Sequence, residues 1–227
     1  MPIRANLLAE IKQALGAAVV PSLTATTAVD DIYEAYLFSL VIRAAQAEDA
    51  TVTLACIQGG PPNPFVFRTS PGYLNSSHRN YGYAIIQLPG CPPLEAHLGV
   101  RVSGHSTVLH ECDVSVLLQS EADVCRSRKT ELVAPRSHKI VIAVEAKYYT
   151  TDLALHLGRG FLGLVRDTSA QNTFFVINRD APSIERLLAH KGEQWEHRVV
   201  PKELRAIGRL TNALQKAFDN FRARYGS

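Results

Sequence analysis

The pattern of hydrophobic and polar positions divides the chain into three parts. Residues 3–47 have the pattern of two helices, and the second is almost entirely apolar, with Glu34 and Arg43 as the charges in its apolar stretch. Residues 58–93 are rich in Gly, Pro, Asn and Ser, which predicts a loop-rich β insertion with short strands. From Leu94 onwards, strand and helix patterns alternate.

The pattern of the second half predicts an α/β fold. We expect strands at residues 98–102, 111–118, 139–148, 173–177 and 195–200, and helices at 153–166, 182–190 and 202–225. The strand at 139–148 is apolar almost throughout, which is typical of a strand covered by helices on both faces. We therefore expect a single domain over residues 1–227, with a mixed central sheet flanked by helices.

Composition narrows the class of protein only slightly. Hydrophobic residues make up 46% of the chain and the formal net charge is +3, which does not by itself require a polyanionic partner. Basic residues are concentrated at 126–139 and 201–227, where phosphates could bind, although such runs usually face solvent. No apolar stretch is long enough to span a membrane, and the four cysteines form no C-x-x-C pair. We expect a cytoplasmic protein that does not enter a membrane.

Two motifs compete within residues 140–163. Gly158, Gly160 and Gly163 spell G-x-G-x-x-G, but a dinucleotide site requires the first glycine to follow a strand directly. Here ten residues separate Lys147 from Gly158, so the glycines fall inside a helix. We interpret them as packing positions, with Gly160 and Gly163 against the sheet.

The second motif is a pair of acidic strand ends. Glu111 and Asp113 are two residues apart and share a face of their strand, as do Glu145 and Lys147 on theirs. If the two strands are neighbours, three carboxylates and one ammonium group lie close together. Burying like charges in one place is costly, and a divalent cation is the usual reason for it.

Taken alone, Glu145-x-Lys147 favours surface ion pairs at a strand end. Asp113 on a preceding strand and Glu34 on a buried helix favour a functional site instead.

These residues resemble the PD-(D/E)xK nuclease superfamily, which has the restriction-endonuclease-like fold. The resemblance rests on "ECDVSVL" followed by "KIVIAVEAKYY" and runs from about residue 30 to residue 177. It implies that Asp113 is the first acid of the motif, Glu145 the second and Lys147 the lysine, with Glu34 as the acid of the preceding helix. It further implies that Asp113, Glu145 and Glu34 bind Mg²⁺ or Mn²⁺.

The chain departs from the motif at two points. Cys112, rather than proline, precedes Asp113. In addition, 31 residues separate Asp113 from Glu145, so residues 119–138 must form an excursion, and its basic character suggests that it flanks nucleic acid.

The resemblance implies a magnesium-dependent endonuclease with DNA as the favoured substrate, similar to some restriction and anti-phage effector nucleases. An activating partner or a homo-oligomer is compatible with it. The expected nucleic-acid contacts are Arg126, Arg128 and Lys129 in the excursion and His156 and Arg159 on the helix after the site. Two alternatives remain: a non-catalytic nucleic-acid-binding or assembly module on the same fold, and a hydrolase of small phosphoesters with a closed pocket.

Overall fold

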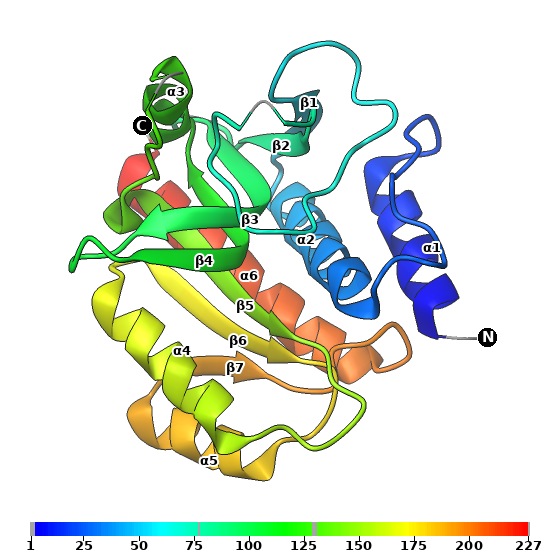
Figure 1. The fold of residues 1–227 in the computed structure, drawn as a ribbon, viewed down its shortest axis with the longest axis vertical. Coiled ribbons are helices and arrows are strands. Elements are labelled where there is room, and N and C mark those ends of the chain that lie inside the picture. The colour runs from blue at the N-terminus through cyan, green and yellow to red at the C-terminus, as the bar shows by residue number, and fades with distance from the viewer. Residues whose placement is uncertain (1–2, 77, 129–130, 227) are drawn as a thin grey trace.

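The computed structural model describes residues 3–76, 78–128 and 131–226. These residues form an α/β fold in which one seven-stranded mixed sheet is flanked by helices (Figure 1). The strands are β1 (Thr51–Cys56), β2 (Gly82–Gln87), β3 (Leu94–Ser103), β4 (Leu109–Leu118), β5 (Ile140–Lys147), β6 (Asn172–Ile177) and β7 (Gln194–Glu196). The helices are α1 (Ile3–Leu15), α2 (Val29–Ala47), α3 (Gln119–Ser127), α4 (Leu155–Asp167), α5 (Pro182–Lys191) and α6 (Leu204–Tyr225), with a short 3-10 helix at Ser137–Lys139. The predicted mixed sheet flanked by helices is confirmed.

The strands lie in the sheet in sequence order, from β1 at one edge to β7 at the other. Neighbouring strands from β1 to β5 are antiparallel, whereas β5, β6 and β7 run parallel to one another. Parallel neighbours require a crossover connection, which α4 provides between β5 and β6 and α5 between β6 and β7. The antiparallel and parallel halves of the sheet therefore meet at β5.

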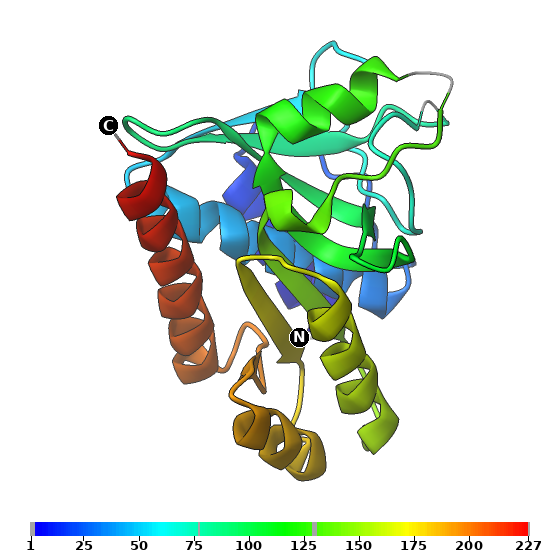
Figure 2. The ribbon, with the colours of Figure 1, turned by 90° about the vertical axis from the view of Figure 1, so that its left-hand side faces the viewer.

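Different helices cover the two faces of the sheet (Figure 2). On one face α2 and α6 pack together against the strands, and α1 packs against α2. On the other face α4 and α5 cover the parallel half, while α3 packs on the antiparallel half. Because α2 lies between α1, α6 and the sheet, most of its residues are buried, which explains its apolar sequence.

Side chains along β5 alternate between these two faces. Ile142, Val144 and Ala146 belong to the core formed with α2 and α6. Successive side chains of a strand point to opposite faces, and Glu145 and Lys147 accordingly lie on the face covered by α4.

The paired residues of the β3–β4 hairpin change the core cluster against which they pack part of the way along the strands. Leu98 and Val114 are paired and belong to the core beneath α2, whereas the next pair toward the hairpin turn, Val100 and Cys112, packs in the cluster with α3. Between them Gly99 has a φ of 56°, a conformation that side chains rarely adopt. The ladder between β4 and β5 begins only at Val114, so the two strands separate just before this residue.

The region expected to be an insertion contributes to the main sheet. Residues 82–87, within the predicted insertion at 58–93, form β2 between β1 and β3. The basic excursion at 119–138 begins with α3 and ends with the 3-10 helix.

The glycines of α4 have different environments from those predicted. A Cβ at Gly160 or Gly163 would meet nothing within 4 Å, and both glycines line an open pocket. The prediction that these two glycines pack against the sheet is therefore wrong. Gly158 is the closely packed one, because a Cβ there would lie 2.9 Å from Cγ2 of Ile184 in α5.

Two further expectations concern the environment of the chain. Within the described ranges no helix combines the length and apolarity needed to cross a bilayer. The four cysteines, Cys56, Cys91, Cys112 and Cys125, are buried free thiols.

Candidate active site

Three of the predicted site residues line one pocket at the end of β5. Asp113 comes from β4, and Glu145 and Lys147 come from β5. We call this hollow the acidic pocket; its volume is about 550 Å³, and His110, Glu111, Gly160, Gly163 and Leu164 complete its lining. Glu34, on α2, lies close enough to Asp113 and Lys147 to interact with their charges.

Asp113 is held between the two strands at the point where they separate. Its Oδ2 accepts a hydrogen bond from the backbone N–H of Ala146 at 2.7 Å. A buried backbone N–H needs an acceptor, and here the carboxylate replaces a strand carbonyl in that role. The side chain of Asp113 is only 8% exposed.

Lys147 contacts both motif carboxylates. Its Nζ lies 2.6 Å from Oε1 of Glu145 and 3.5 Å from Oδ2 of Asp113. Burial alone would lower the pKa of Lys147, but the adjoining Asp113 and Glu145 carboxylates raise it above its usual value. Lys147 therefore carries a positive charge at neutral pH.

The carboxyl groups of the site are harder to ionise than free ones. Burial, reinforced by the charge of Asp113, raises the pKa of Glu34 to about 9 and that of Glu145 to about 7. Burial also raises the pKa of Asp113, which Lys147 and the Ala146 N–H counteract. Without a further cation, Glu34 is protonated at neutral pH.

The donor set fits a hard divalent cation, since all three acids offer oxygen atoms and their raised pKa values would fall beside added positive charge. The carboxylates are not drawn tightly together, however. Among the described residues, only Asp180, Glu185 and His197 form a group of three metal-ligating side chains whose atoms all lie within 4.8 Å of one another.

That second group is already well partnered. His197 Nδ1 lies 3.1 Å from Oδ1 of Asp180 and 3.0 Å from Oε1 of Glu185. Arg198 donates two hydrogen bonds to Asp180, and the N–H of Ala181 donates to Glu185. These bonds account for the cluster as a structural ion-pair network.

Some of the side chains predicted to contact nucleic acid are already bonded within the protein, and others are exposed. Arg126 donates two hydrogen bonds of 2.7 Å to Glu95, which is completely buried, and so neutralises a carboxylate inside the protein. Arg128 pairs with Glu131 at 3.3 Å on the surface, and Lys129 lies outside the described residues. His156 and Arg159 are exposed on α4, and Arg159 immediately precedes Gly160 of the acidic pocket.

A histidine and an aspartate not paired by the sequence analysis meet at the pocket. His110 lines it, and its Nε2 lies 2.6 Å from Oδ2 of Asp167 at the end of α4. The hydroxyl of Ser106 donates to the same oxygen. The Asp167 carboxylate thus lies between the Ser106 hydroxyl and the His110 imidazole. A nucleophilic serine would need the imidazole in direct contact with its own hydroxyl. Because His110 and Asp167 are 57 positions apart in the sequence, no local spacing signals the pair.

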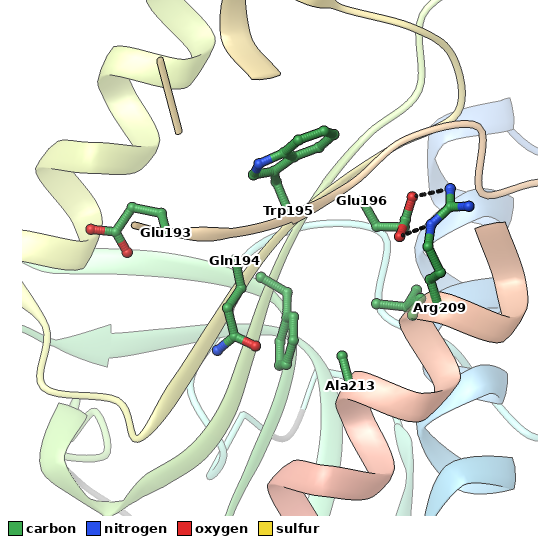
Figure 3. Close-up of a pocket in the computed structure, with 8 residues that line it drawn as sticks. Glu193, Gln194, Trp195, Glu196, Arg209 and Ala213 are labelled. Atoms are coloured by element: carbon green, nitrogen blue, oxygen red, sulfur yellow. Dashed lines mark hydrogen bonds and ion pairs between the residues drawn. The ribbon is translucent and has the colours of Figure 1, made fainter. Parts of the chain in front are cut away.

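A second pocket, of about 230 Å³, lies between β7 and α6 (Figure 3). Arg209 of α6 donates to both carboxylate oxygens of Glu196, at 2.8 and 2.7 Å. Trp195 also lines this pocket and packs against the cluster of α4 and α5. Glu196 and Arg209 neutralise each other here, whereas the acidic pocket brings two carboxylates and an ammonium group together, which makes the acidic pocket the better candidate site.

No family model matches this chain, and neither does any curated protein or solved structure. The geometry and electrostatics of the acidic pocket are therefore the basis for assigning a function.

Proposed function

We propose that the chain is a metal-dependent nuclease with a restriction-endonuclease-like core, which hydrolyses phosphodiester bonds, with DNA as the favoured polymer. One observation carries the proposal. Asp113 and Glu145, on neighbouring strands, lie in one open pocket with Lys147 in contact with both of them. Two carboxylates can hold a cation for metal-assisted phosphate hydrolysis, and an ammonium group beside them can stabilise the charge that develops on the phosphate.

In this proposal Asp113, Glu145 and Glu34 would hold Mg²⁺ or Mn²⁺. When bound, such an ion supplies a water of lowered pKa and polarises the scissile phosphate. Lys147, which stays protonated, stabilises the negative charge that develops on the phosphate. Asp113 is kept in place by the Ala146 N–H, and Glu145, once ionised, orients the attacking water by accepting its hydrogen bond.

The shape of the pocket supports a polymeric substrate. Gly160 and Gly163 present no side chains on the α4 wall, and a Cβ added at either would meet open space. A chain of nucleotides can therefore pass along this wall, with Arg159 and His156 exposed on the same helix. A hydrolase of small phosphoesters would be better served by an enclosed pocket.

A non-catalytic binding module on the same fold is the second candidate, and the burial of Glu34 argues against it. A carboxyl group whose pKa is raised by burial and by neighbouring carboxylates costs stability at neutral pH, which favours a site that binds a cation. The free thiols of the four buried cysteines support a reducing cytoplasm as the compartment. Restriction or anti-phage defence, under the control of an activating partner or a second copy, is the biological setting we propose.

The test is a cleavage assay with the full chain. Supercoiled plasmid, single-stranded DNA and RNA are incubated with Mg²⁺, Mn²⁺ or chelator, beside Asp113→Ala, Lys147→Met and, as a surface control, Lys191→Met. We expect cutting that requires metal, is lost in the first two variants and persists in the control. Turnover that survives in both site variants would refute the proposal, and metal-independent binding without cutting would favour the module.

A further inference from the structure

We propose that His110 is a further catalytic residue of the acidic pocket, which gives a proton to the departing oxygen of the substrate, and that Asp167 is its positioning residue. This inference rests on the proposed nuclease function. It assigns the step that Asp113, Glu145 and Lys147 leave without a proton donor.

Asp167 is fixed by the turn between β3 and β4. The backbone N–H of Ser106 donates to its Oδ1 at 2.8 Å, the Ser106 hydroxyl donates to its Oδ2, and the N–H of His105 donates to its backbone oxygen at 2.7 Å. The carboxylate therefore cannot turn away from His110, whose Nε2 it meets at 2.6 Å.

The hydrogen bond determines the tautomer of His110. Hydrogen bonds from His110 and Ser106 lower the pKa of Asp167 to about 2, so this carboxylate is ionised at neutral pH and can only accept. Nε2 of His110 must then carry the proton. Nδ1, for which the described residues provide no hydrogen-bond partner, is the atom that can exchange a proton with a substrate.

The other groups of the pocket are less suited to this step. The Nζ of Lys147 is already engaged by the carboxylates of Glu145, at 2.6 Å, and Asp113, at 3.5 Å, so it is placed to stabilise negative charge rather than to hand over a proton. Glu111 shares the wall, and burial raises its pKa, but it makes no hydrogen bond with the described residues that would orient it. The Nε2 atom of His110 is held by the Asp167 carboxylate at 2.6 Å, and its side chain is 20% exposed, so solvent protons reach it.

The proposed step balances as follows. A bond forms between the oxygen of the attacking water and phosphorus, and the bond from phosphorus to the departing alcohol oxygen breaks. That oxygen keeps the electron pair and takes the proton from Nδ1, which leaves a neutral imidazole with its Nε2–H still bonded to Asp167. The attacking water releases its proton to solvent, and solvent returns a proton to Nδ1.

The experiment varies the leaving group. The wild-type chain, His110→Ala, Asp167→Asn and the surface control His190→Ala are assayed on a normal oligonucleotide. The same proteins are assayed on two oligonucleotides with sulfur at one or the other bridging position of a single linkage. A thiolate departs without a proton, because thiols are far more acidic than alcohols.

We expect His110→Ala to lower kcat on the normal linkage by about 10²- to 10⁴-fold, with KM little changed. On the oligonucleotide whose sulfur is the leaving atom, the loss of kcat should be less than a tenth of this. Asp167→Asn should show the same selectivity with a smaller loss.

A second measurement does not depend on turnover. Imidazole ¹⁵N spectra of the metal-free protein should show a protonated Nε2 for His110 throughout the pH range in which it is neutral, and Asp167→Asn should change that signal. Where His110→Ala fails to fold, as judged by thermal unfolding, His110→Gln replaces it.

Equal losses on oxygen and sulfur linkages, or no loss on either, would overturn the role of His110 while wild-type cleavage stands. A wild-type chain that cuts none of the substrates would instead overturn the nuclease proposal and this inference with it.

Discussion

Replacing Glu34 with glutamine tests the electrostatic state of the site directly. The pKa of Glu34 is raised from its usual 4.5 to about 9, because burial shields the carboxyl from water and Asp113 and Glu111 repel its charge. In the unfolded chain the carboxyl titrates near its usual value. Between these two pKa values the folded protein keeps a proton that the unfolded chain has released.

The sign and size of the effect follow from linkage. The contribution of Glu34 to the free energy of unfolding is fully present below the pKa of Glu34 in the unfolded chain. It then falls by about 1.4 kcal/mol per pH unit until the pH reaches the pKa of Glu34 in the folded protein. At neutral pH the resulting loss of unfolding free energy is at most about 3 kcal/mol. Glutamine carries no charge at any pH, so Glu34→Gln should remove this part of the slope. The variant should be more stable than wild type at about pH 8, and the difference should shrink toward about pH 4.5.

The assay is urea denaturation in chelator at a series of pH values from about 5 to about 9. Glu131→Gln, the same chemical change on a side chain that is 61% exposed, is the control and should leave the slope as it is. The reasoning is refuted when wild type and Glu34→Gln lose stability in parallel across this range.

The same variant tests the metal assignment. In the proposed function Mg²⁺ binds only the folded chain, so added Mg²⁺ should raise the unfolding free energy of wild type at about pH 8 and raise it less in Glu34→Gln, which lacks one carboxylate. An equal rise in both proteins would show that Glu34 is not a ligand.

Three further outcomes can be checked by thermal or chemical denaturation. Gly160→Ala should stabilise α4 by up to about 1 kcal/mol, whereas Gly158→Ala should destabilise the protein, because its Cβ meets α5 closely; the opposite order would contradict the packing described. Arg126→Ala should cost about 3 to 5 kcal/mol, since it removes two hydrogen bonds and the guanidinium charge from the buried carboxylate of Glu95, which keeps its bonds to His97 and Gln119, and a loss below about 1 kcal/mol would contradict this. Arg209→Ala should cost less than about 1 kcal/mol, because the side chain of Arg209 is 53% exposed; a larger loss would show that the pocket beside β7 depends on it.

The sequence predicted the central part of the fold well, because apolar alternation is a local property. The strand expected at residues 139–148 is β5, Ile140–Lys147, and the spacing of Glu145 and Lys147 correctly places both on one face. In contrast, β2 was assigned to an insertion, because the Gly, Pro and Asn residues around it resemble a loop until its pairing with β1 and β3 is known.

The site was predictable only in part, since its members come from distant segments. The neighbourhood of Asp113 and Glu145 depends on the pairing of β4 with β5, for which the motif resemblance was the only signal. The contact of His110 with Asp167 requires α4 to end beside the β3–β4 turn, and nothing in either segment alone indicates this. The structural role of Arg126, on α3, depends likewise on Glu95, which lies on β3.

The strand order of the sheet has a consequence for how the chain assembles during synthesis. Since the order in the sheet equals the order in the sequence, each strand emerges when its pairing neighbour already exists, and no later strand has to insert between earlier ones. The lining of the acidic pocket ends at Leu164, so it is complete before β6, β7 and α6 are made. The core beneath α2, however, is closed only by α6. A chain interrupted before Leu204 would thus carry every residue of the acidic pocket while leaving an apolar surface open to aggregation.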